Sequence, residues 1–333
     1  MLLLKKVLVL FGGNSYEHYV SCKSAKSIVE NMDKKLFCYE LVGIDFDNKW
    51  YRFDDDLSYL ENGKWKDTHV VPIDNIIEFI QKFDVVFPMI HGYSGEDGKL
   101  QGMLELFDIP FVGCHTLASA LGMDKEMSKI LFEHLGVPQV PYLILEEEKQ
   151  KEIETRIGFP VIVKPANGGS SIGIVKADNK KQLKKAIKEV KQYDSKIIVE
   201  KFVKARELEC AVLEKNNRII CSCLGEIKSA NEIYDYNAKY VNEKSYTTIP
   251  NDLPDKIIKQ IKEYAKQIFT RFHCNGYARI DFFYEEESNQ IYINEINTIP
   301  GFTSISMYPK LMEHEEISYT DLLTILINSA MSK

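Results

Sequence analysis

The sequence lacks the features that mark membrane-spanning, secreted and nucleic-acid-binding proteins. No stretch approaches the roughly 18 consecutive apolar residues that a transmembrane helix needs. The seven cysteines are odd in number and form no CxxC pair, which argues against a disulfide framework and a zinc cage. Acidic and basic residues are interleaved at a net charge of -7, without a continuous basic stripe, so nucleic acid is not an expected partner.

Two common nucleotide-binding signatures are also missing. Neither GxxxxGK[ST] nor GxGxxG occurs, so any nucleotide would be bound by a different architecture. The N-terminal run MLLLKKVLVLF is split by Lys5 and Lys6 and is followed by glycines instead of a small-residue cleavage site. We therefore expect a first β-strand here, no membrane association, and a cytoplasmic protein with reduced thiols.

The 333 residues, 45% of them hydrophobic, predict two or three globular domains. Short apolar runs separated by helix-sized segments predict an N-terminal α/β domain with a parallel sheet over residues 1–113. Residues 114–202 contain a helical link and two strands that a glycine-rich stretch joins into a hairpin. The rest, 203–333, contains more strands, a long loop near 229–248, and a helix from about Pro254 to Phe272.

Polar side chains gather on a second predicted hairpin, formed by ARIDFFY (278–284) and IYINEIN (291–297). If the hairpin is centred on Ser288 with a three- or five-residue loop, Asp281 lies opposite Glu295 and Arg279 opposite Asn297. Two carboxylates and an amide oxygen are ligands suited to magnesium, and an arginine beside them would stabilise developing negative charge. A single hairpin of this kind also fits an ordinary surface ion pair.

The stretch ANGGSSIG (166–173) offers backbone N–H groups and hydroxyls that can approach a phosphate closely. Lys164 precedes it on the strand, and Lys125 in MDKEMSK could supply a second cation, although either lysine alone fits a solvated surface charge. Residues 169–173 also match GxSxG, the nucleophile elbow of serine hydrolases. That motif requires a helix after the turn, whereas a strand-like segment follows here.

Seven motifs, in order along nearly the whole chain, resemble those of the D-alanine–D-alanine ligases, a family of ATP-grasp enzymes. They are FGGNSYEHYVS, HGYSGEDGKLQG, ASALGMDK, VIVKPANGGSSIG, IYDYNAKY, ARIDFFY and NEINTIPGFTS. The resemblance implies a three-domain ATP-grasp fold of the α/β (α+β) class. It also implies a C–N bond-forming ligase that joins two D-alanines through an acyl phosphate for peptidoglycan synthesis, and a homodimer.

The resemblance assigns the cofactor site. It implies two Mg²⁺ ions, with Mn²⁺ as a substitute, on Asp281, Glu295 and Asn297, and a glycine-rich flap over the phosphates of ATP. The residues that it implies for binding ATP are Lys125, Lys164, Ser171, Glu200, Lys201, Phe202, Val203, Glu207 and Lys239.

The resemblance also assigns substrate and catalytic groups. Glu17 would bind the ammonium of the first D-alanine, and Ser170 and Tyr240 would link it to a mobile loop. Arg279 and the Gly301 N–H would stabilise the tetrahedral oxyanion. The remaining substrate residues are His91, Ser306 and Met307.

Several alternatives remain at this level. Related ligases use D-serine or D-lactate as the second substrate, and Tyr240 together with the apolar Met307 favours D-alanine. A serine hydrolase using GSSIG and a nucleotide-binding regulator without turnover are alternatives from other classes.

Overall fold

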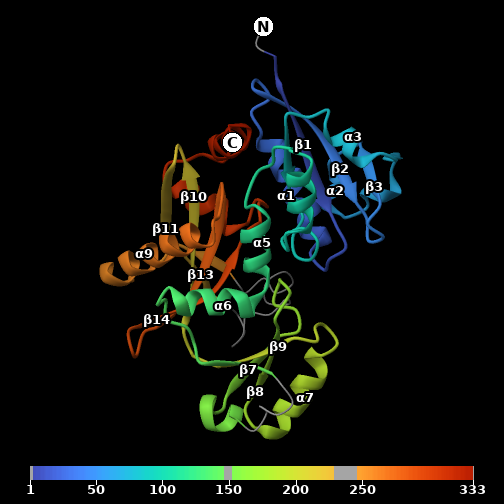
Figure 1. Ribbon diagram of the computed structural model, residues 1–333. Coiled ribbons are helices and arrows are strands. Elements are labelled where there is room, and N and C mark those ends of the chain that lie inside the picture. The colour runs from blue at the N-terminus through green and yellow to red at the C-terminus, as the bar shows by residue number, and fades with distance from the viewer. Residues whose placement is uncertain (1–2, 146–151, 229–245, 333) are drawn as a thin grey trace.

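The computed structural model describes residues 3–145, 152–228 and 246–332, and within them the chain forms three sheets, one after another in the sequence. The first (blue) and third (orange) sheets lie in the upper part of Figure 1, and the middle sheet (green to yellow) lies at the bottom. Two of the sheets have five strands, and the one between them in the chain has four. No helix in the described ranges is both long and apolar enough to cross a membrane. The predicted boundaries at 113 and 202 fall between consecutive sheets, but the three-domain division itself stays a prediction.

The N-terminal sheet is mixed, not parallel throughout as the sequence had suggested. Strand β1 (Lys5–Gly12) lies between β2 (Phe37–Ile44) and β5 (Val85–Pro88), and both of these pairs are parallel. Strands β3 (Trp50–Phe53) and β4 (Val70–Pro72) are added antiparallel at one edge. The connection from β2 to β3 is too short for the crossover that a parallel pair needs. The helices of this region are α1 (His18–Asn31), α2 (Ser58–Glu61), α3 (Ile76–Ile80) and α4 (Lys99–Leu106), with a short 3₁₀ turn at Trp65–Asp67.

The middle sheet confirms the predicted glycine-rich hairpin. Strands β7 (Val161–Pro165) and β8 (Val175–Ala177) pair antiparallel, and β9 (Ile197–Lys201) pairs with the other edge of β7. The fourth strand is β6 (Tyr142–Ile144), and a short helical turn spans Ile153–Ile157. Helix α7 (Lys180–Val190) begins after the Asn179 cap and buries its apolar stripe against the sheet, as its 3.6-residue period predicts.

The third sheet has the strand order β12-β11-β10-β13-β14. Helix α9 (Asp255–Arg271) packs against it and ends within a residue of the predicted bounds. Of the predicted long loop near 229–248, residues 229–245 lie outside the described part, and the last three residues form β12. The strands of this sheet are β10 (Arg206–Lys215), β11 (Arg218–Lys228), β12 (Tyr246–Thr248), β13 (Tyr277–Glu285) and β14 (Gln290–Asn297). Two further helices, α5 (Thr116–Met123) and α6 (Lys125–His134), lie earlier in the chain, before the middle sheet.

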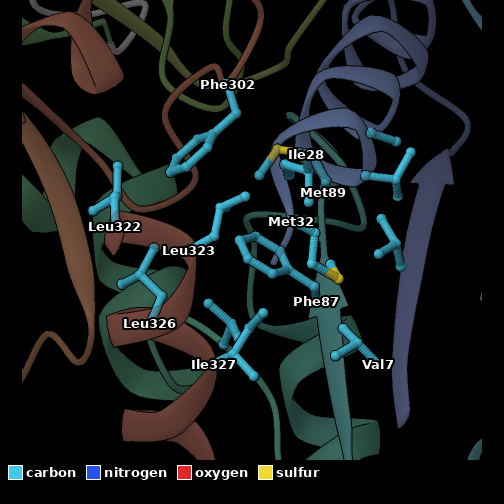
Figure 2. Packing of buried hydrophobic residues seen from close by; sticks show 14 of the residues in the cluster. Val7, Ile28, Met32, Phe87, Met89, Phe302, Leu322, Leu323, Leu326 and Ile327 are labelled. Carbon is cyan, nitrogen blue, oxygen red and sulfur yellow. The ribbon is translucent and has the colours of Figure 1, made fainter. Parts of the chain in front are cut away.

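The C-terminal end of the chain returns to the N-terminal sheet. After α10 (Met307–His314), helix α11 (Tyr319–Met331) lies against β5 and α1, with Leu323 and Ile327 on the side toward Met32 and Phe87 (Figure 2). Phe302, from the segment after β14, is fully buried in the same cluster. This shared core ties the third sheet to the first. The cluster includes Leu322, Leu323, Leu326 and Ile327 of α11 together with Val7, Ile28, Met32, Phe87 and Met89.

Leu323→Ala tests this shared core. Leu323 is fully buried, so truncation removes apolar contacts and leaves a cavity, and we expect a loss of about 2–5 kcal/mol in the free energy of unfolding. Urea denaturation followed by circular dichroism measures the loss. Leu106→Ala is the matched control, because Leu106 is 76% exposed and should change the stability by less than about 0.5 kcal/mol. Equal effects for the two variants would contradict the assigned packing.

Candidate active site

The β13–β14 hairpin sets out the predicted polar patch. Arg279 pairs with Asn297 and Asp281 with Glu295, as the sequence predicted. The predicted loop length was wrong, because residues 286–289 form a four-residue loop. The register shifts between Asp281 and Phe282, so β14 contains one extra residue there, and this bulge restores the predicted pairing at the site. The four side chains therefore project from one face of the sheet.

Arg279 is the centre of a buried ion-pair network and not of a surface pair. Its Nε and Nη2 donate to the two carboxylate oxygens of Asp281 at 2.8 and 2.7 Å. Glu209 on β10 lies opposite Asp281, and its Oε1 is 3.3 Å from the Arg279 Nε. Burial alone would lower the pKa of Arg279, but these two carboxylates raise it well above its usual value. The guanidinium is therefore a fixed positive charge beside the patch.

Lys125 joins this patch to the glycine-rich hairpin. It is the first residue of α6, whose Asp124 cap accepts hydrogen bonds from the N–H groups of Glu126 and Met127. The Lys125 Nζ donates to the Gly168 carbonyl at 2.7 Å and lies 3.7 Å from Oε2 of Glu295. Burial lowers the pKa of Lys125. Lys125 is enclosed between the Glu295 carboxylate and the glycine-rich hairpin, so it is not a solvated surface charge.

A second buried cation cluster lies on the middle sheet. The carboxylate of Glu200 on β9 is shared by Lys164 on β7, at 2.8 Å, and by Lys129 on α6, at 2.7 Å. Burial alone would raise the pKa of Glu200, but the two ammonium groups lower it to about 2. Burial lowers the pKa of Lys129, whose Nζ lies 4.7 Å from the centre of the Tyr142 ring. Two lysines and one carboxylate leave an excess of positive charge in a buried site, which favours an anionic ligand.

Glu17 connects the N-terminal sheet to the glycine-rich hairpin. The Ser170 hydroxyl donates to its Oε1 across 153 positions of sequence. Two glycines enclose the same carboxylate, because a Cβ on Gly92 or Gly169 would lie 2.7 or 2.6 Å from Oε2. Ser170 itself has a left-handed backbone, with φ of 51°, which turns the hairpin tip toward Glu17. The sequence therefore needs small residues at both glycine positions to admit this carboxylate.

Glu96 is a half-buried carboxyl group beside Glu17 that was not among the predicted site residues. Its Oε2 accepts the Gly92 N–H at 2.7 Å, and its Oε1 accepts the Ile299 N–H at 2.9 Å. Burial, and then the negative charge of Glu17, raise its pKa to about 8 against these hydrogen bonds. A carboxyl group that keeps its proton near neutral pH is characteristic of functional sites.

His91 and the segment after β14 complete the junction. The His91 Nδ1 lies 2.9 Å from the Ile299 carbonyl oxygen, and its Nε2 lies 3.2 Å from the Ser24 hydroxyl. Ser306 accepts the Thr303 N–H at 2.9 Å, and a Cβ on Gly301 would lie 2.8 Å from its hydroxyl oxygen. These contacts hold the turn at Gly301 beside the N-terminal sheet.

Met307 is buried in the core shared by the first and third sheets, although it had been predicted to line the second-substrate position. It packs so closely on β11 that a Cβ on Gly225 would lie 2.4 Å from its sulfur. The predicted place of Met307 beside the second substrate stays a prediction.

Comparison with known proteins identifies the family to which this chain belongs. A model described as the D-ala D-ala ligase N-terminus matches residues 6–114, and one described as the D-ala D-ala ligase C-terminus matches residues 131–328. This chain belongs to the D-alanine–D-alanine ligase family. A D-alanine–D-alanine ligase from Acetivibrio thermocellus is 44% identical over 99% of this chain and 96% of its own length. One from Caldicellulosiruptor bescii is 44% identical over 98% of this chain and 95% of its own length.

Solved structures of ligases show that the chain has the ATP-grasp fold. A D-Ala:D-Ser ligase, VanG, from Enterococcus faecalis aligns with a TM-score of 0.88 and 35% identity, covering 98% of this chain and all of the neighbour. The D-alanine–D-alanine ligase from Coxiella burnetii aligns with a TM-score of 0.85 and 34% identity, covering 99% of this chain and 94% of the neighbour.

The structure of this D-alanine–D-alanine ligase family member brings most of the predicted site residues to one junction between the three sheets. The residues predicted to contact adenine make contacts of different kinds. The Lys201 Nζ donates to the Phe159 carbonyl at 3.1 Å, and the ring of Phe202 lies 4.1 Å from the Lys176 Nζ. Val203 and Glu207 are half-buried at the start of the third sheet. Lys239 and Tyr240 lie outside the described residues, so their predicted roles stay predictions. The residues that the structure gathers are Glu17, His91, Lys125, Lys164, Ser170, Ser171, Glu200, Arg279, Asp281, Glu295, Asn297, Gly301 and Ser306.

The donor set on β13 and β14 fits a magnesium-type ion. Asp281, Glu295 and Asn297 provide hard oxygen ligands on one face, and Asn297 Nδ2 is 2.9 Å from Oδ2 of Asp281, so the groups already converge. In this conformation Asn297 donates to Asp281, and its amide oxygen is the group that would bind a metal ion.

The GSSIG segment does not have the geometry of a hydrolase elbow. It joins two antiparallel strands, β7 and β8, whereas the elbow requires a strand followed by a helix. The serine-hydrolase interpretation is therefore not supported by the fold.

The sequence analysis missed Lys129, Glu209 and Glu96. Lys129 lies one helical turn after Lys125, and i, i+4 spacing on the predicted helix could have placed both on one face. Glu209 lies two residues after Glu207 on the same face of a strand. Glu96 gave no comparable signal, because its burial depends on the approach of Ile299, 203 positions away.

Glu96→Gln tests the raised pKa of Glu96. The folded protein keeps the Glu96 proton up to about pH 8, whereas the unfolded chain releases it near 4.5. The wild type therefore loses stability relative to the variant as pH rises from about 5 to 8, by at most about 5 kcal/mol. Melting temperatures of both proteins without ligands, measured across this range, should show a difference that changes with pH. The exposed Glu189→Gln variant should differ from wild type by the same small amount at every pH. A pH-independent difference for Glu96→Gln would contradict the assignment.

Proposed function

We propose that this ligase joins two D-alanine molecules into D-alanyl-D-alanine and converts ATP to ADP and phosphate. The observation that carries the proposal is the contact of Ser170 with Glu17. It places a carboxylate suited to a substrate ammonium at the tip of the hairpin whose first strand carries Lys164. An amino-acid site and a phosphate site are then adjacent, as phosphorylation of an amino-acid carboxylate requires.

The ATP phosphates would lie between Lys125 and Lys164, under the glycine-rich hairpin. Both lysines are held by carboxylates, Glu295 and Glu200 respectively, so their ammonium groups are positioned before any ligand binds. The adenosine would contact the segment from Glu200 to Val203, with Ser171, Glu207 and Lys239 as further contacts. Two Mg²⁺ ions, or Mn²⁺ in their place, would be bound by Asp281, Glu295 and Asn297 and would supply charge neutralisation for the phosphates.

In the first step, a carboxylate oxygen of the first D-alanine attacks the γ-phosphorus of ATP. An O–P bond forms, the bond to the β-phosphate oxygen breaks, and the products are an acyl phosphate and ADP. Glu17 would bind the ammonium of this D-alanine and so orient its carboxylate toward Lys164 and Arg279. The carboxylate oxygen thereby becomes part of a good leaving group.

In the second step, the deprotonated amine of the second D-alanine attacks the acyl carbon. The tetrahedral oxyanion is stabilised by the Arg279 guanidinium and the Gly301 N–H, and phosphate leaves as the amide forms. Arg279 is suited to this role because Asp281 and Glu209 hold its planar group in one orientation. His91 and Ser306 would position the second substrate, and closure of a loop carrying Tyr240 would exclude water from the acyl phosphate.

The cellular setting follows from this reaction. The dipeptide is a component of peptidoglycan precursors, so we place the enzyme in the cytoplasm, where ATP is available, as a homodimer of three-domain chains. We place the domain boundaries at 113 and 202, between the sheets.

A D-alanine–D-serine or D-alanine–D-lactate ligase is the second candidate, favoured by the similarity to a D-Ala:D-Ser ligase structure at a TM-score of 0.88. ADP release should be measured with D-alanine alone, with D-alanine plus D-serine or D-lactate, and with L-amino acids. We expect D-alanine alone to support the fastest turnover. Absence of any response to D-alanine would refute the proposal, whereas ATP binding without turnover under all pairs would indicate a regulator.

Glu295→Gln tests the proposed metal and phosphate site. The substitution removes one carboxylate charge from the ligand set, and we expect ADP formation to fall at least about a hundredfold. The melting temperature should change little, because Glu295 is half-buried and its carboxylate lies 3.7 Å from the Lys125 ammonium group, a long ion pair. Glu287→Gln in the exposed hairpin loop is the control and should keep full activity. Wild-type ADP formation by Glu295→Gln would place the phosphate site elsewhere.

A further inference from the structure

A second group of metal-type side chains lies away from the proposed active site. Cys223 on β11 meets His314, the last residue of α10, and Glu315, which follows it. The Cys223 sulfur, a ring nitrogen of His314 and a carboxylate oxygen of Glu315 all lie within 4.8 Å of one another. We propose that these three residues bind one divalent ion of the zinc class.

The chemistry of the three side chains selects the kind of ion. A thiolate, an imidazole and a carboxylate are the ligands of Zn²⁺ and of Co²⁺, whereas magnesium prefers oxygen ligands alone. Three protein ligands leave a fourth tetrahedral position for water. In such a site the ligand atoms lie about 3–4 Å apart, so the observed separations need to close by only about 1 Å. His314 is exposed and can make this movement by a rotamer change.

A backbone hydrogen bond already holds the carboxylate of Glu315 beside Cys223. The Cys223 N–H donates to Oε1 of Glu315 at 2.5 Å, which leaves the second carboxylate oxygen to face an ion. The ligands His314 and Glu315 also lie at the C-terminal end of α10, where the partial negative charge of the helix favours a cation. The positive charge of Lys262 opposes the binding of a cation at this site. The same charge lowers the pKa of the Cys223 thiol.

Binding exchanges a proton for the ion. Burial and Glu315 raise the pKa of Cys223, so the free thiol carries its proton near neutral pH. When the ion forms its bond to sulfur, the S–H bond breaks and the proton passes to solvent. The bound ion then connects the end of α10 to β11. Helix α10 begins at Met307, which packs on the same strand at Gly225, so both ends of the helix would be fixed to β11.

The test uses the full-length protein after treatment with a chelator. Co²⁺ is titrated in the presence of excess Mg²⁺, which occupies sites made of oxygen ligands. We expect the near-ultraviolet thiolate-to-cobalt absorption to appear and to saturate at one Co²⁺ per chain, and Zn²⁺ to abolish it. Cys223→Ser should abolish this signal, and His314→Ala and Glu315→Gln should weaken Co²⁺ binding at least about tenfold.

Cys38→Ser is the matched control, because Cys38 is an exposed thiol on β2, far from the cluster in sequence and fold. It should leave the absorption unchanged. Cys223→Ser should keep wild-type ADP release, which shows that the variant is folded. A wild type without the absorption, or a Cys223→Ser variant that retains it, would overturn the proposal. Loss of the absorption in Cys38→Ser would overturn it as well.

Discussion

The return of the chain's C-terminal end to the N-terminal sheet is the constraint on which the site depends. Helix α11 and Phe302 bury their apolar side chains against β5 and α1 in one continuous core. This packing places Ile299 next to His91 and Glu96. The Ile299 carbonyl oxygen hydrogen-bonds to His91, and the Ile299 N–H donates to Glu96. Glu17, which follows the first strand of the N-terminal sheet, is thereby brought near the polar patch on β13 and β14 of the third sheet. Neither sheet by itself carries both Glu17 and this patch.

The charges at the junction are arranged in advance of any ligand. Arg279 is held by two carboxylates, and Glu200 is held by two lysines. Such buried groups are costly to desolvate, and their networks contribute orientation more than stability. Because these side chains are fixed by their partners, they need little reorganisation when a phosphate or an oxyanion develops. The pairing of buried charges thus connects the energetics of the fold to the chemistry that we propose.

The β13–β14 hairpin shows how far local pattern extends. Strand alternation placed Arg279, Asp281, Glu295 and Asn297 on one face, and the structure confirms their pairing. The loop length was wrong, because a bulge and a four-residue loop produce the same register at the site as the loop that was expected. Period and pairing are local properties of strands, whereas a bulge adjusts to the packing around it. The mixed character of the first sheet was missed for a similar reason, since apolar runs do not reveal strand direction.

The sequence by itself determined the α/β character, the glycine-rich hairpin, the hairpin with the metal-type side chains and the resemblance to the ligase family. These features depend on residue types and spacings that lie close together in the chain. Only the tertiary structure decided that Glu17 meets Ser170, that Lys129 shares Glu200 with Lys164, and that Glu96 meets Ile299. It also assembled Cys223 with His314 and Glu315, although the spacing of the cysteines had argued against a zinc cage. Burial, and the pKa values that follow from it, are set by contacts between distant segments, so no local pattern encodes them.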